Sequence, residues 1–287
     1  MTSTASLAIV TLAAGKGTRM KSDLHKVLHP IAGRPMIEHL LAAAAQLSPT
    51  RSVVVAGHGR EQLEAQLGSR ATIAVQDPQL GTGHAVQQAE AALDGFDGDV
   101  LILYGDVPFV SADTMRTMVA RLHAEDRPAV VVLGFEPADT LAYGRVIADG
   151  DRIVKMVEHK DASEAERACR LCNSGLMAVR SADLFGLLAR VTNDNSQGEY
   201  YLVDVVNVAN ADGRTCAVVV TPDPHEVEGI NSRAELAQAE HRWQNRRRKA
   251  AMDDGATLIA PETVWFAWDT VLGRDVLVEP NVFFGPG

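Results

Sequence analysis

The residues best suited to chemistry lie in a short segment near the N-terminus. An apolar run ends in Leu12-Ala13-Ala14 and is followed by Gly15-Lys16-Gly17-Thr18-Arg19-Met20, with Lys26 a little further along the chain. Glycines let backbone N–H groups approach phosphate oxygens and form an anion-binding concavity. Arg19 and Lys26 add mobile positive charge. We therefore predict that residues 12–26 bind phosphate groups.

Two familiar phosphate-binding motifs do not fit this segment. The segment is not a Walker A loop. In that motif two glycines are separated by four residues, and the second is followed directly by Lys and by Ser or Thr, which is not the case here. In the dinucleotide fingerprint Gly-x-Gly-x-x-Gly, Met20 stands where the third glycine belongs. A lone Gly-x-Gly is also compatible with a plain tight turn, so further motifs are needed to assign the segment.

The first two thirds of the chain alternates between strand-like and helix-like stretches. Short apolar runs predict strands at residues 7–12, 52–56, 72–75, 99–104 and 129–134, and helical patterns predict helices from Pro35 and over residues 60–67, 82–93 and 112–123. This alternation predicts a mostly parallel α/β sheet with flanking helices, which binds ligands at the carboxyl ends of its strands. The loops after Leu12 and Tyr104 both fall at that edge.

The pattern changes after Tyr143. Strands at residues 145–147 and 153–158 flank Asp149-Gly150-Asp151 and predict a hairpin, and more strands are expected at residues 171–179 and 216–220. A long polar helix is expected over residues 232–252. It carries Arg246-Arg247-Arg248-Lys249, which would suit nucleic acid, but the net charge of the chain is -10. We therefore interpret the run as the solvated face of a linker helix.

The C-terminal tail has a period of its own. Leu258, Val264, Thr270, Val276 and Val282 recur at intervals of six residues. Such a period is typical of a β-helix, in which each short strand forms one side of a coil. Only about one and a half coils fit, whereas a solenoid usually needs about three repeats. We expect the tail to be a fragment of a longer solenoid or to lean on a partner chain.

Composition narrows the class of protein. The chain is 46% hydrophobic and 22% charged, as globular proteins are. No apolar run reaches the ~20 residues that span a bilayer, and the N-terminus lacks a basic signal region, so we expect a soluble, cytoplasmic protein. The acidic balance argues against a general nucleic-acid binder. Cys169 and Cys172 form a C-x-x-C without the second pair that zinc needs, and are expected to be small semi-buried residues.

Several motifs together resemble the N-terminal part of bacterial N-acetylglucosamine-1-phosphate uridyltransferases, the uridyltransferase half of the bifunctional enzymes called GlmU. The resemblance starts in the glycine-rich segment and spans essentially the whole chain. Its further motifs, in order, are Ser22-Asp23-Leu24-His25-Lys26-Val27-Leu28-His29, Ala32-Gly33-Arg34-Pro35, Gln79-Leu80-Gly81-Thr82-Gly83-His84-Ala85, Tyr104-Gly105-Asp106-Val107-Pro108, Tyr143-Gly144-Arg145, Val157-Glu158-His159-Lys160-Asp161, Asn173-Ser174-Gly175, Gln197-Gly198-Glu199-Tyr200-Tyr201 and Val227-Glu228-Gly229-Ile230-Asn231.

The resemblance implies a Rossmann-like nucleotidyltransferase fold of the GT-A type and a role for each matching position. The triphosphate would be held by Leu12, Ala13, Ala14, Gly15 and Lys26, with Arg19 and Lys26 as catalytic residues. Gln76, Gly81 and Thr82 would read the uracil. Tyr104, Gly105, Gly144, Glu158, Asn173 and Asn231 complete the substrate-binding set, chiefly around the amino sugar. Asp106 and Asn231 would ligate Mg²⁺, which takes one or two protein oxygens besides phosphates and waters.

Taken alone, these residues also have structural interpretations. Asp106 is compatible with a helix N-cap or a turn, and Asn231 with a cap of the helix that begins at Ser232. Tyr104, Gln76, Glu158 and Asn173 are compatible with ordinary core, surface or turn positions. His25 and His84 are interpreted as structural.

The activity that the resemblance implies is Mg²⁺-dependent transfer of uridylate from UTP to N-acetylglucosamine 1-phosphate. The products would be UDP-N-acetylglucosamine, for peptidoglycan and lipopolysaccharide precursors, and pyrophosphate. Two alternatives stay open. One is a uridylyl- or thymidylyltransferase for another sugar 1-phosphate, such as glucose 1-phosphate. The other is a non-catalytic subunit that binds a sugar nucleotide. No nucleic acid or membrane partner is expected.

The expected domains are a nucleotidyltransferase domain (residues 1–231), a linker helix (232–253) and the start of a left-handed β-helix of hexapeptide repeats (254–287). Members of the family continue into a longer β-helix that carries an acetyltransferase site and assembles as a trimer. The present residues include only the first coils. Acetyl transfer is therefore not expected from them, and the short β-helix weakens the case for a homotrimer.

Overall fold

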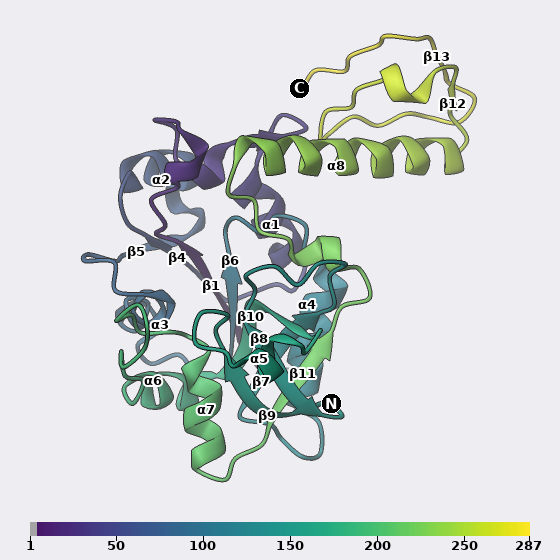
Figure 1. Cartoon of the computed structure of the whole chain (residues 1–287). Helices are drawn as coiled ribbons and strands as arrows, with labels where there is room; N and C mark the ends of the chain where they lie inside the picture. The colour runs from purple at the N-terminus through teal and green to yellow at the C-terminus, as the bar shows by residue number, and fades with distance from the viewer. Residues whose placement is uncertain (1–4) are drawn as a thin grey trace.

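The computed structural model describes residues 5–287 and is built on one nine-stranded sheet (Figure 1). One half of the sheet consists of four parallel strands in the order β5-β4-β1-β6. These strands are Thr72–Val75, Arg51–Ala56, Leu7–Ala13 and Asp99–Tyr104. Every residue of β1 is buried, which explains why its sequence is an almost unbroken apolar run.

The other half of the sheet is mixed. β10 (Cys172–Arg180) runs antiparallel between β6 and β7 (Val130–Phe135), and β11 (Cys216–Val220) is parallel to β7. β9 (Arg152–Val157) and β8 (Arg145–Asp149) form the predicted hairpin at the edge. The expectation of a mostly parallel sheet therefore holds only for the first half, because tight connections such as this hairpin join antiparallel strands.

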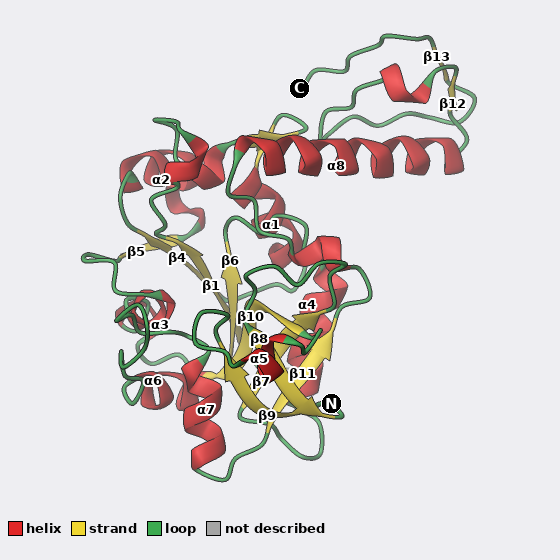
Figure 2. Ribbon diagram, in the orientation of Figure 1, coloured by secondary structure: helices red, strands yellow, loops and turns green. Residues whose placement is uncertain are grey.

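Helices cover both faces of the sheet (Figure 2). On one face lie α1 (Met36–Ala45), α2 (Arg60–Leu67) and α4 (Ala112–Leu122). On the other lie α3 (Thr82–Gln87), α6 (Ser181–Leu188) and α7 (Asp204–Ala211). The helix expected over residues 82–93 thus ends at Gln87, and α6 and α7 were not expected from the sequence. Two apolar clusters result, one on each side of β1 and β6.

Short elements complete the connections. A small hairpin, β2 (Pro30–Ile31) with β3 (Arg34–Pro35), precedes α1, and α5 (Glu164–Arg167) follows β9. The 3-10 helices are Thr18–Met20, Lys26–Leu28, Gly68–Arg70, Ala91–Leu93, Pro224–Val227 and Pro261–Thr263. The first two lie in the glycine-rich segment and its continuation, which is therefore a series of tight turns.

The longest helix, α8 (Arg233–Asp253), lies beyond the end of the sheet and carries the C-terminal tail along its side (Figure 1). Its basic run is solvated only in part. Arg246 and Lys249 are exposed, as the sequence suggested. Arg248 is only 4% exposed, and its Nε donates to the carbonyl oxygen of Val264 at 2.8 Å. The guanidinium of Arg246 lies 4.9 Å from the ring centroid of Phe109. The run therefore also contacts the tail and the loop after β6.

The tail makes parallel pairs with itself. β12 (Thr257–Leu258) pairs with β13 (Leu277–Val278), and Trp265 pairs with Phe283. Of the residues with six-residue spacing, Leu258 and Val264 are buried, and Val276 and Val282 pack against the same cluster. The period therefore marks the residues that face α8.

A single buried amide also joins the tail to α8. Gln244 is 1% exposed. Its Nε2 donates to the carbonyl oxygen of Phe266 at 2.7 Å, and its Oε1 accepts from the N–H of Phe266 at 2.8 Å. The Gln244 side chain thereby satisfies both the backbone N–H and the backbone carbonyl group of Phe266.

Within residues 5–287, no helix combines the length and the apolar character needed to cross a bilayer. The three cysteines are free thiols, of which Cys172 and Cys216 are buried and Cys169 is half-buried. In the same range, no three side chains of the types His, Cys, Asp and Glu are grouped so as to hold a metal. The C-x-x-C therefore lacks the partners that a zinc site requires.

Candidate active site

A cavity of about 510 Å³ opens at the carboxyl ends of β1 and β6. It is lined by residues from segments that lie far apart in the sequence. Those expected to bind the nucleotide, the metal or, for Tyr104, the amino sugar are Leu12, Ala13, Ala14, Gly15, Lys26, Gln76, Gly81, Thr82, Tyr104 and Asp106. The fold thus brings most of the sequence-predicted positions to one hollow, at the edge where parallel strands present their loops.

The register of β1 and β6 explains why the two loops meet. Leu12 pairs with Tyr104, and the N–H of Gly105 donates to the carbonyl oxygen of Leu12 at 2.9 Å. A Cβ on Gly105 would lie 3.2 Å from a methyl group of Val27. Glycine at this position lets the loop after β6 pass close to the glycine-rich segment.

Lys26 lies at the centre of a polar cluster. Its Nζ is 2.5 Å from Oδ2 of Asp106 and 3.0 Å from Oδ1 of Asn231. The Lys26 and Asp106 side chains are only 12% and 16% exposed. A backbone hydrogen bond also holds Asp106 close to Asn231, because the N–H of the neighbouring Ile230 donates to the carbonyl oxygen of Asp106 at 2.9 Å. A carboxylate and an amide oxygen that converge on one cation form a donor set that suits Mg²⁺.

Asn231 does not cap α8, although the sequence allowed that interpretation. Ser232 is the N-cap, and its Oγ accepts from the N–H of Glu235 at 3.3 Å. Oε2 of Glu235 accepts in return from the N–H groups of Asn231 and Ser232, at 2.6 and 3.0 Å. This capping box satisfies the helix terminus. The Asn231 side chain is then available to Lys26.

Gln76, which also lines the cavity, is 5% exposed and fixed by two hydrogen bonds. Its Nε2 donates to the carbonyl oxygen of Gly81 at 2.9 Å and to Nδ1 of His84 at 3.1 Å. Gly81 has φ 111°, and a Cβ there would lie 2.6 Å from the carbonyl oxygen of Tyr200. Only glycine readily adopts this positive φ and has no Cβ to collide with that oxygen.

The segment around Gly81 packs on the backbone of a later motif. The N–H of Gly83 donates to the carbonyl oxygen of Tyr200 at 2.8 Å. The N–H of Tyr200 donates to the carbonyl oxygen of Leu80, also at 2.8 Å. Oγ1 of Thr82 accepts from the N–H of Leu202 at 2.9 Å. The two motifs at residues 79–85 and 197–201 therefore form one wall of the cavity.

Gly144, Glu158 and Asn173 do not line the 510 Å³ cavity but gather beside its Tyr104 wall. The N–H of Asn173 donates to the carbonyl oxygen of Gly144 at 2.9 Å, and a Cβ on Gly144 would lie 3.3 Å from Oε2 of Glu158. Burial raises the pKa of Glu158, and Asp204 raises it further. Burial also raises the pKa of Tyr104, to which the charge of Glu158 adds. The group forms a second, partly desolvated set of polar side chains.

Arg19 lies apart from these groups. It is exposed on the 3-10 helix Thr18–Met20 and does not line the cavity. The structure therefore does not bring it to the Lys26–Asp106 pair. Gly17, with φ 60°, precedes it, and a Cβ there would lie 2.8 Å from Cβ of Lys26. That glycine lets the segment fold back over Lys26.

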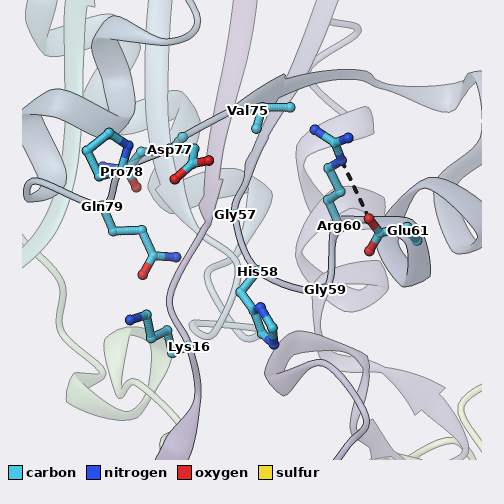
Figure 3. Close-up of a pocket in the computed structure, with 11 residues that line it drawn as sticks. Lys16, Gly57, His58, Gly59, Arg60, Glu61, Val75, Asp77, Pro78 and Gln79 are labelled. Carbon is cyan, nitrogen blue, oxygen red and sulfur yellow. Dashed lines mark ion pairs between the residues drawn. The ribbon is translucent and has the colours of Figure 1, made fainter.

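A larger cavity of about 750 Å³ adjoins the first and shares Lys16, Gln76 and Gln79 with it. Figure 3 shows the Lys16 and Gln79 side chains on the same side of this hollow. Nε2 of Gln79 donates to the carbonyl oxygen of Ala14, and a Cβ on Gly57 would lie 2.5 Å from that nitrogen. Lys16 and Gln79 were not among the sequence-predicted site residues, although both lie in motifs singled out there.

Comparisons with known proteins agree with this geometry. The model of the MobA-like NTP transferase domain family matches residues 9–197. The chain is 82% identical, over 97% of its length, to the bifunctional protein GlmU of Novosphingobium aromaticivorans. It is 73% identical, over 98% of its length, to the bifunctional protein GlmU of Sphingopyxis alaskensis. The chain spans 62% of the length of each relative.

A solved structure of a UDP-glucose pyrophosphorylase complexed with UDP-glucose matches the fold with a TM-score of 0.66. The match covers 84% of this chain and 100% of that one, at 19% sequence identity. At this identity the likeness concerns the fold alone.

Proposed function

Because this chain belongs to the MobA-like NTP transferase domain family, we propose that it transfers uridylate from UTP to N-acetylglucosamine 1-phosphate and releases pyrophosphate. The observation that carries the choice of substrates is the 82% identity to a bifunctional protein GlmU, over 97% of the chain. The convergence of Asp106 and Asn231 on the Lys26 ammonium supports the chemistry.

In the proposed reaction, a phosphate oxygen of the sugar phosphate attacks the α-phosphorus of UTP while pyrophosphate leaves. The attacking oxygen is already an anion, so no side chain has to remove a proton. The main obstacle is the repulsion between two anionic substrates. Lys26 offsets that repulsion, because its ammonium lies at the cavity wall and is only 12% exposed. Positive charge in such a position is screened less than it would be in water.

Asp106 and Asn231 would hold Mg²⁺, whose charge would neutralise phosphate oxygens when it is bound. Their oxygens suit the ion because both already face one cation, the Lys26 ammonium, at 2.5 and 3.0 Å. The contribution of the chain is to fix those oxygens. The Asp106 backbone accepts from Ile230, and Glu235 holds the backbone of Asn231.

We assign the remaining predicted residues by their places in the structure. Leu12, Ala13, Ala14 and Gly15 would present backbone to the triphosphate. Arg19, which the resemblance also assigns to the triphosphate, lies exposed outside the cavity in this structure. Gln76, Gly81 and Thr82 contact the uracil. Tyr104, Gly144, Glu158 and Asn173 hold the amino sugar, with Gly105 keeping its loop close to β1. Oδ1 of Asn173 accepts from the N–H of Gly175 at 2.9 Å, which directs its amide donors elsewhere.

The proposed domains are residues 1–231, 232–253 and 254–287, with the last as the start of a left-handed β-helix. Support comes from the pairing of Trp265 with Phe283, which lie three six-residue sides apart, and from the burial of Leu258 and Val264. The reaction is assigned to the cytoplasm, where its nucleotide substrate is available.

The test is a matrix of turnover assays with Mg²⁺. UTP, dTTP and CTP are each combined with N-acetylglucosamine 1-phosphate or glucose 1-phosphate, and pyrophosphate release and sugar-nucleotide formation are both measured. UTP with N-acetylglucosamine 1-phosphate should be the fastest pair, and a chelator should stop it. Faster turnover of any other pair, or no turnover at all, would overturn the proposal.

A further inference from the structure

We propose that His84 is a positioning residue that sets the preference for uracil over cytosine by fixing the side-chain amide of Gln76. The inference rests on the proposed function, because it assumes that Gln76 faces the base of a pyrimidine nucleotide. His84 itself lies behind Gln76 on α3 and does not line the cavity. It therefore acts through Gln76 and not by touching the base.

The hydrogen bonds of Gln76 determine which way its amide points. An amide NH₂ group has two N–H donors, and its oxygen is only an acceptor. Both donors of Gln76 are used, one by the carbonyl oxygen of Gly81 at 2.9 Å and the other by Nδ1 of His84 at 3.1 Å. The group that Gln76 can still offer to a ligand is its oxygen, Oε1. In the bond between the two side chains Nδ1 of His84 is the acceptor, because an amide nitrogen can only donate.

Uracil and cytosine differ at the position that such an acceptor would read. Uracil carries an N3–H donor between two carbonyl groups. Cytosine has an unprotonated N3 and an amino group in place of one carbonyl. An amide oxygen pairs with N3–H of uracil but meets a lone pair on N3 of cytosine. A site built around one hydrogen-bonding pattern rejects a base that leaves its polar groups unpaired.

His84 is needed because a single hydrogen bond to Gly81 holds the amide less firmly than two. Without Nδ1, a flip of the whole planar amide, which turns Nε2 toward the base in place of Oε1, breaks one hydrogen bond instead of two. A donor at that place would suit N3 of cytosine. The surroundings do not move to compensate, since Gly81 and Gly83 pack closely on the backbone of Tyr200. The loss of one hydrogen bond of typical strength corresponds to about a fivefold to tenfold change in the UTP-to-CTP preference.

The experiment compares three variants with the wild-type chain. His84→Ala removes the acceptor, and His84→Met removes it while filling a similar volume. In His84→Asn, Oδ1 stands near the place of Nδ1 and can still accept from Gln76. The kcat/KM ratio of UTP to CTP is measured with N-acetylglucosamine 1-phosphate, and binding of UDP and CDP is measured by calorimetry. We expect the ratio to fall about fivefold to tenfold in the Ala and Met variants and to stay close to wild type in the Asn variant.

Two results would overturn the inference. One is a wild-type ratio in both folded loss variants, and the other is an Asn variant that behaves like Ala. If the His84→Ala variant fails to fold, the comparison of His84→Met with His84→Asn still tests whether an acceptor at this position sets the UTP-to-CTP ratio. Failure of the proposed function has a different signature, since the wild-type chain would then not turn over UTP. A structural defect at His84 would lower both kcat/KM values together and leave their ratio unchanged.

Discussion

Lys26 and Asp106 form an ion pair of 2.5 Å inside the cavity, although they lie on different loops at the carboxyl edge of the sheet. The pair is the most direct test of the chemistry. Lys26→Ala and Asp106→Ala should each lower kcat by about 10²–10³, because the first removes a positive charge that offsets the repulsion between the substrates and the second removes a proposed Mg²⁺ ligand. The double variant should lose less than the product of the two effects, since the residues work as a unit. Steady-state kinetics and circular dichroism give the two readouts, and near wild-type rates in folded single variants would refute the assignment.

Gly81 should not tolerate a side chain. Gly81→Ala combines φ 111° with a Cβ only 2.6 Å from a backbone oxygen, so it should destabilise the protein by ~2 kcal/mol or more. Gly95→Ala is the matched control, because φ is 65° there but no atom lies within 4 Å of the added Cβ. Gly95→Ala should lower the free energy of unfolding by only about 1 kcal/mol. Chemical denaturation measures both values, and equal costs would argue against the backbone clash.

Glu235 should matter to both stability and metal binding. Glu235→Ala removes the acceptor for two backbone N–H groups of the capping box, which should cost about 1 kcal/mol of unfolding free energy. It also releases the backbone of Asn231, so the Mg²⁺ concentration for half-maximal activity should rise. Glu235→Gln keeps an acceptor and should recover most of both effects. If Ala and Gln lower the unfolding free energy equally, the capping argument fails.

Glu158 should make stability depend on pH. Burial holds the pKa of Glu158 above its usual range in the folded protein, so the folded state keeps this proton at a higher pH than the unfolded state does. Stability is then lost as pH rises from the ordinary carboxyl range through the raised pKa. Glu158→Gln should be more stable than wild type at neutral pH, with the gain shrinking in acid, and should lose sugar binding. Thermal midpoints across pH measure this, with exposed Glu164→Gln as the control. A constant difference between Glu158→Gln and wild type at all pH values would contradict the argument.

The sequence predicted the regular parts of the fold well. Arg60–Leu67, Thr72–Val75 and Asp99–Tyr104 have the same bounds in the structure as in the sequence-based prediction. Fully buried strands appear in a sequence as short apolar runs, which are easy to delimit. α6 and α7 were missed because helices of eight residues show barely two turns of periodicity, and tertiary packing decides their conformation.

The features that the sequence did not predict depend on contacts between segments far apart in the chain. The interpretation of Arg246-Arg247-Arg248-Lys249 as solvated holds for the exposed Arg246 and Lys249. It was wrong for Arg248, because composition does not reveal that the carbonyl group of Val264 lies beside this side chain. Asn231 could not be separated from an ordinary helix cap until the structure placed Lys26 against its side chain. The hydrogen bond between His84 and Gln76 could not be predicted from the sequence for the same reason, since Gln76 lies outside the motif that contains His84.

The Gln244 amide has a consequence for how α8 and the tail respond to solvent. It binds Phe266 through neutral groups on both sides and is almost completely buried. Dissolved ions weaken attractions between opposite charges but act little on neutral hydrogen bonds shielded from water. The attachment of the tail should therefore withstand changes in ionic strength that loosen exposed ion pairs elsewhere on the surface, such as Arg190 with Asp212.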